Sequence, residues 1–278
     1  MMKNIFFMAC MVASLGSHAQ THRFIYDVEY RKDSTRTVTT RENYHLDIEP
    51  TQIRYYPRDF FVGDSLVAYN RTIPEGIHFN TSTILTHTPG SDEYDDYDVL
   101  ENITLKLSSK NQQDWKLTDE KKKVKDLHLQ KATATWGGRN WTAWFTPDIP
   151  FQEGPYKFHG LPGLIVELYD DRSNYRFELV KTQKLATPYD NQYISYMTGN
   201  SIPVSEEKYI TAKLKYYDSP VNTLRNNSGS TKTSEEFYLN DGTKVGQNNS
   251  REVNDRLRES VRKYNNPIEL NKAIKYPL

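Results

Sequence analysis

The sequence is nearly free of cysteine. Its single cysteine, Cys10, lies in an apolar stretch close to the N-terminus. If that stretch is removed, the remaining chain has no thiol, which excludes disulfides and zinc–thiolate sites. A lipoprotein signal ending at Cys10 is the competing interpretation. It is disfavoured because Phe7, Met8 and Ala9 form a poor lipobox and leave a short apolar region before the cysteine.

The chain also lacks a surplus of charge of either sign. Lys and Arg number 36, and Asp and Glu also number 36. Nucleic-acid binding through overall basic charge is therefore excluded. After the first residues, no run approaches the roughly 20 apolar residues that a membrane-spanning helix needs. We expect no transmembrane span and a soluble mature chain.

The first 19 residues have the pattern of a secretory signal peptide. Lys3 precedes an apolar region at residues 5–13, and Ser17 and Ala19 are small residues at the positions that a signal peptidase reads. We expect cleavage after Ala19 and export to the periplasm or cell envelope, with secretion as an alternative. Residues 20–278 are then predicted to form a single β-rich domain with a flexible loop near 226–250.

Alternating polar and apolar residues recur along much of the chain, and 20 tyrosines and four tryptophans supply much of the apolar surface. Aromatic residues and period-two patterns both favour strands. The pattern predicts a mainly β (α+β) fold: an antiparallel curved sheet, sandwich or open barrel of hairpins, with one or two C-terminal helices packed on it. The clearest strand candidates before residue 110 are 24–30, 44–48, 53–56, 60–62, 66–69 and 103–107.

One hairpin can be predicted to the residue. Gly137 and Gly138 suit a two-residue loop, and counting outward pairs Trp136 with Arg139 and Ala134 with Trp141. The predicted core face carries Trp136, Ala134, Ala132, Trp141, Ala143 and Phe145. Trp144 falls on the other face, and Arg139 is expected to stack on Trp136 at the tip.

Two helices are predicted in the last third of the chain. Ser205 can cap a helix that runs to Asp218, where Pro220 is expected to stop it. Val253, Leu257 and Val261 recur at helical spacing in a second helix. Between them, residues 226–250 are rich in turn-forming residues and are expected to form a long loop with a short hairpin at 240–242.

The segment 154–170 combines a turn with a strand. Pro162 and Gly163 suit a type II turn over residues 161–164, and the branched residues that follow suit a buried strand. A second hairpin is expected between 164–169 and 175–180. Gly160, Pro162 and Gly163 are therefore interpreted as a structural corner between two hairpins.

The same segment resembles a known family. Residues 160–165 read Gly-Leu-Pro-Gly-Leu-Ile, and the chain is similar to the GLPGLI family of exported bacterial proteins here and at residues 143–150. The resemblance implies export but no activity, because the family has none assigned. Relatives carry a cysteine near the position of Leu129, so the resemblance implies no thiol function for this chain.

Recognisable catalytic motifs are absent. The sequence has no zinc-binding His-Glu-x-x-His, no Gly-x-Ser-x-Gly elbow and no phosphate-binding loop. Ser205 and Lys208 match Ser-x-x-Lys, but a helix cap explains that serine better. The sequence therefore favours a protein that is not an enzyme, and it predicts no catalytic residue and no cofactor.

Two groups of residues are candidates for binding. Trp144, Tyr156, Phe158 and His159 bring aromatic rings and an imidazole to the signature segment, a combination that can bind a ligand. The acidic run Asp92, Glu93, Asp95, Asp96 and Asp98 offers oxygen ligands for calcium, although its spacing is not that of an EF-hand and a solvated loop is the simpler interpretation.

Three functional hypotheses follow. The first is an exported envelope protein without enzymatic activity, which binds an apolar small molecule or an envelope protein on an aromatic-lined concave face. The second is a hydrolase or other enzyme with a site assembled near His159. The third is a structural or assembly component of the envelope, which would expose a large apolar patch. The sequence leaves the oligomeric state open.

Overall fold

The computed structural model describes residues 20–70, 83–100, 103–227, 236–239 and 242–277. The predicted signal peptide, residues 1–19, lies outside the described residues. Within them, no helix combines the length and the apolar character needed to cross a membrane.

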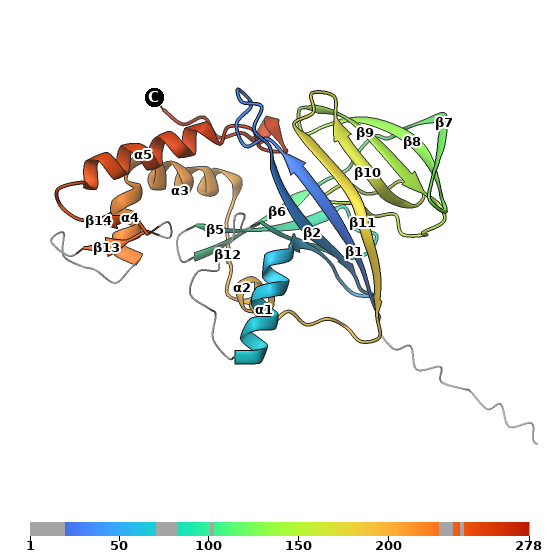
Figure 1. The fold of residues 1–278 in the computed structure, drawn as a ribbon, viewed down its shortest axis with the longest axis horizontal. Coiled ribbons are helices and arrows are strands. Elements are labelled where there is room, and N and C mark those ends of the chain that lie inside the picture. The colour runs from blue at the N-terminus through green and yellow to red at the C-terminus, as the bar shows by residue number, and fades with distance from the viewer. Residues whose placement is uncertain (1–19, 71–82, 101–102, 228–235, 240–241, 278) are drawn as a thin grey trace, which may run out of the picture.

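One large sheet dominates the fold (Figure 1). Its twelve strands have the order β12-β6-β5-β4-β3-β2-β1-β11-β10-β9-β8-β7. Every neighbouring pair is antiparallel except β12 and β6, which are parallel. The predicted mainly β fold with a curved antiparallel sheet is confirmed. The strands are β1 (Thr21–Tyr30), β2 (Thr40–Ile48), β3 (Ile53–Pro57), β4 (Ile84–His87), β5 (Glu93–Leu100), β6 (Ile103–Lys110), β7 (Lys116–Val124), β8 (Leu127–Trp136), β9 (Arg139–Thr146), β10 (Leu164–Asp170), β11 (Tyr175–Leu185) and β12 (Ile202–Pro203).

The two predicted hairpins are confirmed, and so is the register that was predicted for the first of them. Trp136 pairs with Arg139 and Ala134 with Trp141 across β8 and β9, and Leu168 pairs with Phe177 across β10 and β11. The predicted core face of β8 and β9 is buried, with Trp136 half-buried. The environment predicted for Arg139 is wrong, because its side chain is buried and lies over the ring of Tyr175, 4.9 Å from the ring centre.

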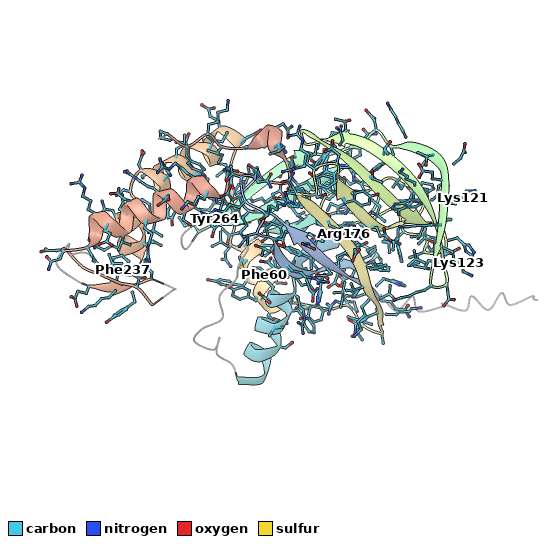
Figure 2. The ribbon with its side chains drawn as sticks, turned by 45° about the horizontal axis from the view of Figure 1, so that its top comes forward. Phe60, Lys121, Lys123, Arg176, Phe237 and Tyr264 are labelled. Atoms are coloured by element: carbon cyan, nitrogen blue, oxygen red, sulfur yellow. The ribbon has the colours of Figure 1, made fainter. Side chains whose placement is uncertain are left out.

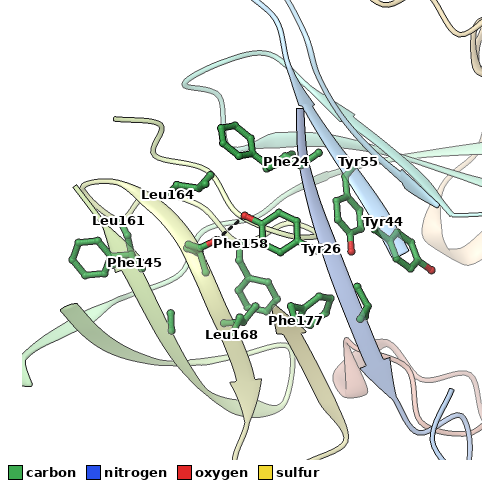
Figure 3. Close-up of a cluster of buried hydrophobic side chains, with 14 of the residues drawn as sticks. Phe24, Tyr26, Tyr44, Tyr55, Phe145, Phe158, Leu161, Leu164, Leu168 and Phe177 are labelled. Carbon is green, nitrogen blue, oxygen red and sulfur yellow. Dashed lines mark hydrogen bonds between the residues drawn. The ribbon is translucent and has the colours of Figure 1, made fainter. Parts of the chain in front are cut away.

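The concave face of the sheet carries the main hydrophobic core (Figure 3). Alternate residues of β1, β2 and β3 point into it and meet side chains from β8 to β11. Residues 147–163, which connect β9 to β10, contribute Phe158 and Leu161 to the same core. The hydroxyl of Tyr26 donates to the carbonyl of Ile165 at 2.6 Å, which ties β1 to the strand that follows the signature corner.

The convex face of β3, β4 and β5 is covered by two helices that the sequence did not predict. These are α1 (Arg58–Asn70) and α2 (Gln192–Gly199). Phe60 lies on α1 (Figure 2), and it packs in one cluster with Tyr56 and Ile84 from the strands and with Ile194 and Met197 from α2. The strands predicted at 60–62 and 66–69 are therefore wrong. Phe60 and Asp64 lie one helical turn apart, and Asp64 accepts hydrogen bonds from Tyr189 and Tyr193. These tertiary contacts outweigh the strand preference of the aromatic and branched residues.

The C-terminal third forms a helical lobe that contains α3 (Glu206–Asp218), α4 (Pro220–Asn227) and α5 (Ser250–Lys263). Ser205 caps α3 by accepting from the Lys208 amide at 3.3 Å, as predicted. Pro220 ends α3 but also begins α4, which fits the preference of proline for the first helical position. Part of the predicted loop is a hairpin of β13 (Phe237–Tyr238) and β14 (Lys244–Val245). Residues 228–235 and 240–241 lie outside the described residues.

After α5 the chain returns to the sheet as a segment that we call the C-terminal strap, residues 264–277. It contains the short 3-10 helix η1 (Leu270–Lys272) and crosses the tip of the β8–β9 hairpin. Gly137 and Gly138 adopt φ of +62° and +80°, and a Cβ on either would approach strap backbone atoms to 3.2–3.3 Å. The two glycines thus form the hairpin turn and also allow the strap to pass close to it.

Candidate functional site

The signature segment forms the expected corner, but by a different turn. Gly163 has φ of +147°, and its amide donates to the Leu161 carbonyl at 2.7 Å. The Leu164 amide donates to Ile149 at 3.1 Å instead of closing a type II turn. A Cβ on Gly163 would lie 2.1 Å from the carbonyl oxygen of Thr146, so only glycine fits. Gly163 is therefore required for the backbone conformation of the corner and for its close contact with Thr146.

The four residues proposed from the sequence to bind a ligand are not brought together. Phe158 is fully buried in the core, where its ring lies 4.6 Å from that of Trp141. Trp144 lies on the opposite face of β9, with the ammonium of Lys122 4.3 Å from its ring centre. Tyr156 and His159 line two different hollows, described below.

A cavity of about 450 Å³ lies on the concave side of the sheet. Its walls come from the inner faces of the sheet, the signature segment, the start of α3 and the strap. Aromatic and aliphatic side chains dominate the lining, with a small number of charged groups. The residues that we use in the argument are Tyr30, Tyr44, Tyr55, Asp96, Leu107, Tyr156, Lys157, Tyr175 and Glu269.

The strand registers place one row of residues across the cavity wall. Tyr55 on β3 pairs with Leu85 on β4, Leu85 pairs with Asp96 on β5, and Asp96 pairs with Leu107 on β6. Directly paired residues point to the same face, so the phenol of Tyr55 and the carboxyl of Asp96 share the concave side. The ring of Tyr44 stacks on that of Tyr55 with their centres 5.0 Å apart (Figure 3).

A buried lysine holds two carboxylates at the cavity. The Lys157 side chain is 1% exposed, and its Nζ lies 2.5 Å from Oδ2 of Asp96 and 2.7 Å from Oε1 of Glu269. We call these three residues the buried triad. Burial raises the pKa of Asp96 to about 6, although the neighbouring ammonium opposes that shift. Lys157 and Lys272 together hold the pKa of Glu269 below its ordinary value against the effect of burial.

The strap supplies Glu269 and is held in place by Arg139. The Arg139 guanidinium donates to the side chain of Asn266 at 2.6 Å and to the carbonyls of Pro267 and Ile268 at 2.7 and 3.0 Å. The positive charge of the guanidinium is balanced by the buried carboxylate of Asp170, whose Oδ2 lies 3.0 Å from Nη1 of Arg139. A single arginine at the tip of the β8–β9 hairpin therefore positions the strap over the cavity.

Tyr156 completes this side of the cavity. It has φ of +58°, a left-handed conformation that is uncommon outside glycine. In this conformation its hydroxyl donates to Oε1 of Glu269 at 2.8 Å. Such local strain persists where the surroundings hold it, and here the Glu269 hydrogen bond and the packing against Trp136 and Phe158 do so.

Two polar groups that face the cavity have no protein partner. The Tyr55 side chain is 4% exposed, yet its hydroxyl makes no hydrogen bond to any described residue. Asp96 uses Oδ2 for Lys157, and its Oδ1 makes no hydrogen bond within the described part of the chain. Neither atom is among the described side-chain atoms that are both cut off from solvent and without a hydrogen bond, so both are open to the cavity and available to a ligand there.

The acidic run proposed to bind calcium is spread over both faces of β5 and the turn before it. Four of its carboxylates pair with four different lysines: Asp92 with Lys110, Asp95 with Lys106, Asp96 with Lys157 and Asp98 with Lys213. Over the described ranges, no group of three or more His, Cys, Asp or Glu side chains is arranged to hold a metal ion. Because side chains alternate between the two faces of a strand, these carboxylates lie apart and pair with different lysines.

His159 opens on a second, more polar groove of about 970 Å³. Its Nδ1 lies 3.0 Å from the carbonyl of Lys157, which can only accept a hydrogen bond. This contact favours the tautomer with the proton on Nδ1 and leaves Nε2 as an acceptor. The groove also contains Glu153, whose carboxylate lies 3.2 Å from Nε2 of His87. Trp144 lines neither this groove nor the concave cavity.

Sequence reasoning missed the central residues of the cavity. Neither Lys157 nor Glu269 is named from the sequence as a candidate binding residue. Tyr55 is placed only in a predicted strand, and Asp96 is named only as a candidate calcium ligand. One signal was present, because Lys157 is the single charge between two aromatic residues, Tyr156 and Phe158. A charge in such a setting predicts a buried ion pair. Nothing local indicates that Glu269 is its partner.

Comparisons with known proteins assign no activity to the chain. The sequence profile of a family described as "Protein of unknown function (Porph_ging)" matches residues 96–167, a segment that runs from Asp96 to the strand after the signature. The expected resemblance to a family without assigned function is thereby supported, whereas the GLPGLI name remains a prediction. No curated protein matches the chain.

Among solved structures, the chain is similar to a protein named PNGF-II in two crystal forms. In the P21 form the TM-score is 0.51 at 15% identity, over 70% of this chain and 33% of that chain. In the C2 form the TM-score is 0.49 at 16% identity, over 67% and 31%. The chain therefore spans about a third of the length of PNGF-II, and the similarity to the P21 form concerns the fold alone. The chain is thus similar, over residues 96–167, to a family of unknown function.

Proposed function

We propose that this protein binds a small molecule with an apolar body in the concave cavity. The observation that carries the proposal is a pair of polar groups, the Tyr55 hydroxyl and Oδ1 of Asp96, which have no hydrogen-bond partner among the described residues and line a mainly apolar and aromatic cavity. A few polar groups that converge in an apolar cavity are the usual features of a ligand site.

The size and construction of the cavity support this reading. Its volume of about 450 Å³ lies within the roughly 300–1,000 Å³ of typical small-molecule sites. Its walls are rigid, because Tyr156, Lys157 and Glu269 are linked by hydrogen bonds and the strap is anchored by Arg139. A preorganised site loses little conformational entropy on binding.

The proposal keeps the sequence-based hypothesis of an aromatic concave face but relocates its residues. Tyr156 remains in the site, Tyr55 and Asp96 are added, and Trp144 and Phe158 are removed. The signal-like pattern of residues 1–19 supports the further proposal that binding takes place in the periplasm or cell envelope.

Filling the cavity tests the proposal. A neutral solvatochromic dye such as Nile red, added to the purified protein, should show blue-shifted and enhanced emission. Leu107→Trp should abolish that signal, because Leu107 lines the cavity. Leu117→Trp is the matched control, because Leu117 on β7 is 53% exposed and does not line the cavity. Equal dye binding by all three proteins would refute the proposal.

A specific observation also favours an enzyme as the second candidate. The Lys157 carbonyl favours one tautomer of His159, and His159 lines a groove large enough for a substrate. An imidazole held in this way can act as a general base. His159→Gln should then abolish hydrolysis of an ester or amide substrate without changing dye binding in the concave cavity, and unchanged hydrolysis would exclude this candidate.

A further inference from the structure

We infer that the ligand of the concave cavity is an organic cation, an amine carried on an apolar body. This inference rests on the proposed function and concerns the charge of the ligand. Three features carry it: the balance of charge in the buried triad, the position of the free oxygen of Asp96, and the aromatic rings around it.

The buried triad contains two carboxylates and one ammonium. Among the described residues, Lys157 is the one buried cation that contacts both Asp96 and Glu269, at 2.5 and 2.7 Å. Lys272 also contacts Glu269, at 2.6 Å, but its side chain is 37% exposed, so water screens its charge. With both carboxylates ionised, the enclosed groups carry one excess negative charge. Uncompensated charge away from water is unfavourable, and a bound cation would compensate it.

The free oxygen of Asp96 marks where the cation would bind. Its Oδ2 is occupied by Lys157, while Oδ1 remains available as an acceptor and about a fifth of the side chain is exposed to the cavity. Tyr55 lies two strands away in the same row, or roughly 10 Å between backbones at the usual strand spacing. An ammonium that donates to Asp96 can therefore carry a body that reaches the Tyr55 ring and hydroxyl.

The aromatic rings suit a cation with an apolar body. Tyr44 and Tyr55 form a stacked pair that lines the cavity, with ring centres 5.0 Å apart. Tyr30 and Tyr175 form another pair, but protein cations already lie over it, with Arg139 4.9 Å from the Tyr175 ring centre and Lys32 5.9 Å from that of Tyr30. Ring faces attract ammonium groups and also pack against hydrocarbon. Carboxylate and aromatic rings together are therefore more complementary to an amine than to a neutral molecule.

An anionic ligand is disfavoured by the same geometry. The Lys157 ammonium is enclosed, and its two short contacts are already made to protein carboxylates. A ligand carboxylate entering the cavity would face Oδ1 of Asp96, and Asp98 and Glu206 also line the wall. Lys272 lines it too, but its ammonium is paired with Glu269 at 2.6 Å. Lys213 already neutralises Asp98 at 2.6 Å. Repulsion should therefore weaken the binding of anions.

Calorimetric titration with three isosteric probes tests the inference. The probes are 2-phenylethylamine, which is cationic, 2-phenylethanol, which is neutral, and 3-phenylpropionate, which is anionic. We expect the amine to bind at least tenfold more tightly than the alcohol and the anion to bind most weakly. Asp96→Asn should remove the advantage of the amine and leave the alcohol unaffected. Asp95→Asn is the matched control, because Asp95 pairs with Lys106 and does not line the cavity.

The dependence on pH gives a second test with the unaltered protein. The charged groups that face Asp96 are Lys157, Glu269 and, from farther out, Lys272. Burial raises the pKa of Asp96 to about 6, so raising the pH from 5 to 7.5 should strengthen amine binding and leave alcohol binding unchanged.

The outcomes separate the inference from the proposed function. If the alcohol or the anion binds as tightly as the amine and Leu107→Trp blocks the binding, the cavity is a ligand site and the inference of a cation is wrong. Amine binding that survives Leu107→Trp takes place elsewhere and also overturns the inference. If no probe binds at millimolar concentration while Nile red does, the inference fails and the proposed function stands. Absence of both probe and dye binding refutes both.

Discussion

Nζ of Lys157 lies 2.7 Å from Oε1 of Glu269, a carboxylate 112 residues farther along the chain. This contact joins the signature segment to the C-terminal strap, and Asp96 on β5 joins both at the same nitrogen. Three distant parts of the sequence therefore meet at one buried ammonium. This ammonium therefore links three of the segments that form the wall of the cavity.

Replacing Lys157 should destabilise the protein strongly. Lys157→Met keeps the apolar stem but leaves two buried carboxylates without their cation, and breaking a buried ion pair in this way costs about 3–5 kcal/mol. Chemical denaturation monitored by tryptophan fluorescence measures the loss. Lys131→Met, which removes a salt bridge to Glu120, a side chain that is 60% exposed, should leave the denaturation midpoint nearly unchanged. Similar midpoints for both variants would contradict the role assigned to Lys157.

Arg139 should control the mobility of the strap. Arg139→Lys keeps the charge near Asp170 but cannot reproduce the planar fork that holds Asn266, Pro267 and Ile268. We expect amide hydrogen exchange of residues 266–273 to accelerate at least tenfold. Arg176→Lys on β11 is the control, because Arg176 is half-exposed and forms its salt bridge with nearby Glu178, away from the strap. Unchanged protection of the strap in Arg139→Lys would show that other contacts hold it.

The two glycines of the signature should respond differently to alanine. Gly163→Ala places a Cβ 2.1 Å from a backbone oxygen, so we expect a loss of more than about 3 kcal/mol or a failure to fold. Gly160 has φ of +86° with no atom within 4 Å of the added Cβ, so Gly160→Ala should cost only about 1–2 kcal/mol. Thermal denaturation of the two variants provides the comparison. Equal losses would mean that conformation alone, without the steric contact, determines the requirement for Gly163.

The stability of the protein should depend on pH through Asp96. Burial raises the pKa of this carboxyl from 3.8 to about 6, so the folded state binds its proton more tightly than the unfolded state. The resulting stabilisation is complete below pH 4 and is lost as the pH rises through 6, a change of about 2–3 kcal/mol. The contribution of Glu269 to the pH dependence has the opposite sign, because its pKa is lowered in the folded state. The stabilisation from Glu269 is present above its ordinary pKa of 4.5 and is lost as the pH falls below that value.

Denaturant titrations at pH 5, 6 and 7 measure this dependence. The difference in the free energy of unfolding between the wild-type protein and Asp96→Asn reports the contribution of the Asp96 carboxyl, because the other titrating groups are common to both proteins. The wild-type protein should lose stability relative to the variant as the pH rises. If the difference in the free energy of unfolding between the two proteins stayed the same from pH 5 to pH 7, the raised pKa assigned to Asp96 would be contradicted.

Local patterns predicted much of the sheet. The register of the β8–β9 hairpin follows from Gly137 and Gly138 because a two-residue loop fixes the pairing of the residues on either side. The Ser205 cap of α3 and the apolar spacing of α5 depend on neighbouring residues and are also predicted from the sequence. The error at α1 arose because Phe60 and Phe61 favour strands locally, while the helix is stabilised by packing on Tyr56 and Ile84 from the adjoining strands.

The cavity could not be predicted in the same way. Its defining contacts join Tyr55, Asp96, Lys157 and Glu269, which are separated by tens of residues and meet only once the sheet is ordered and the strap returns. Aromatic residues near the signature indicated the correct region, since Tyr156 lines the cavity. Neither their number nor their spacing indicates that Phe158 points into the core and Trp144 to the opposite face.

Native mass spectrometry of the protein isolated gently from its own cells tests the central claim most directly. The account predicts a bound small molecule of defined mass on the wild-type protein and on Leu117→Trp, but not on the cavity-filled variant Leu107→Trp. Bare protein in all three samples, or the same bound mass on Leu107→Trp, would contradict the claim that the concave cavity is a ligand site.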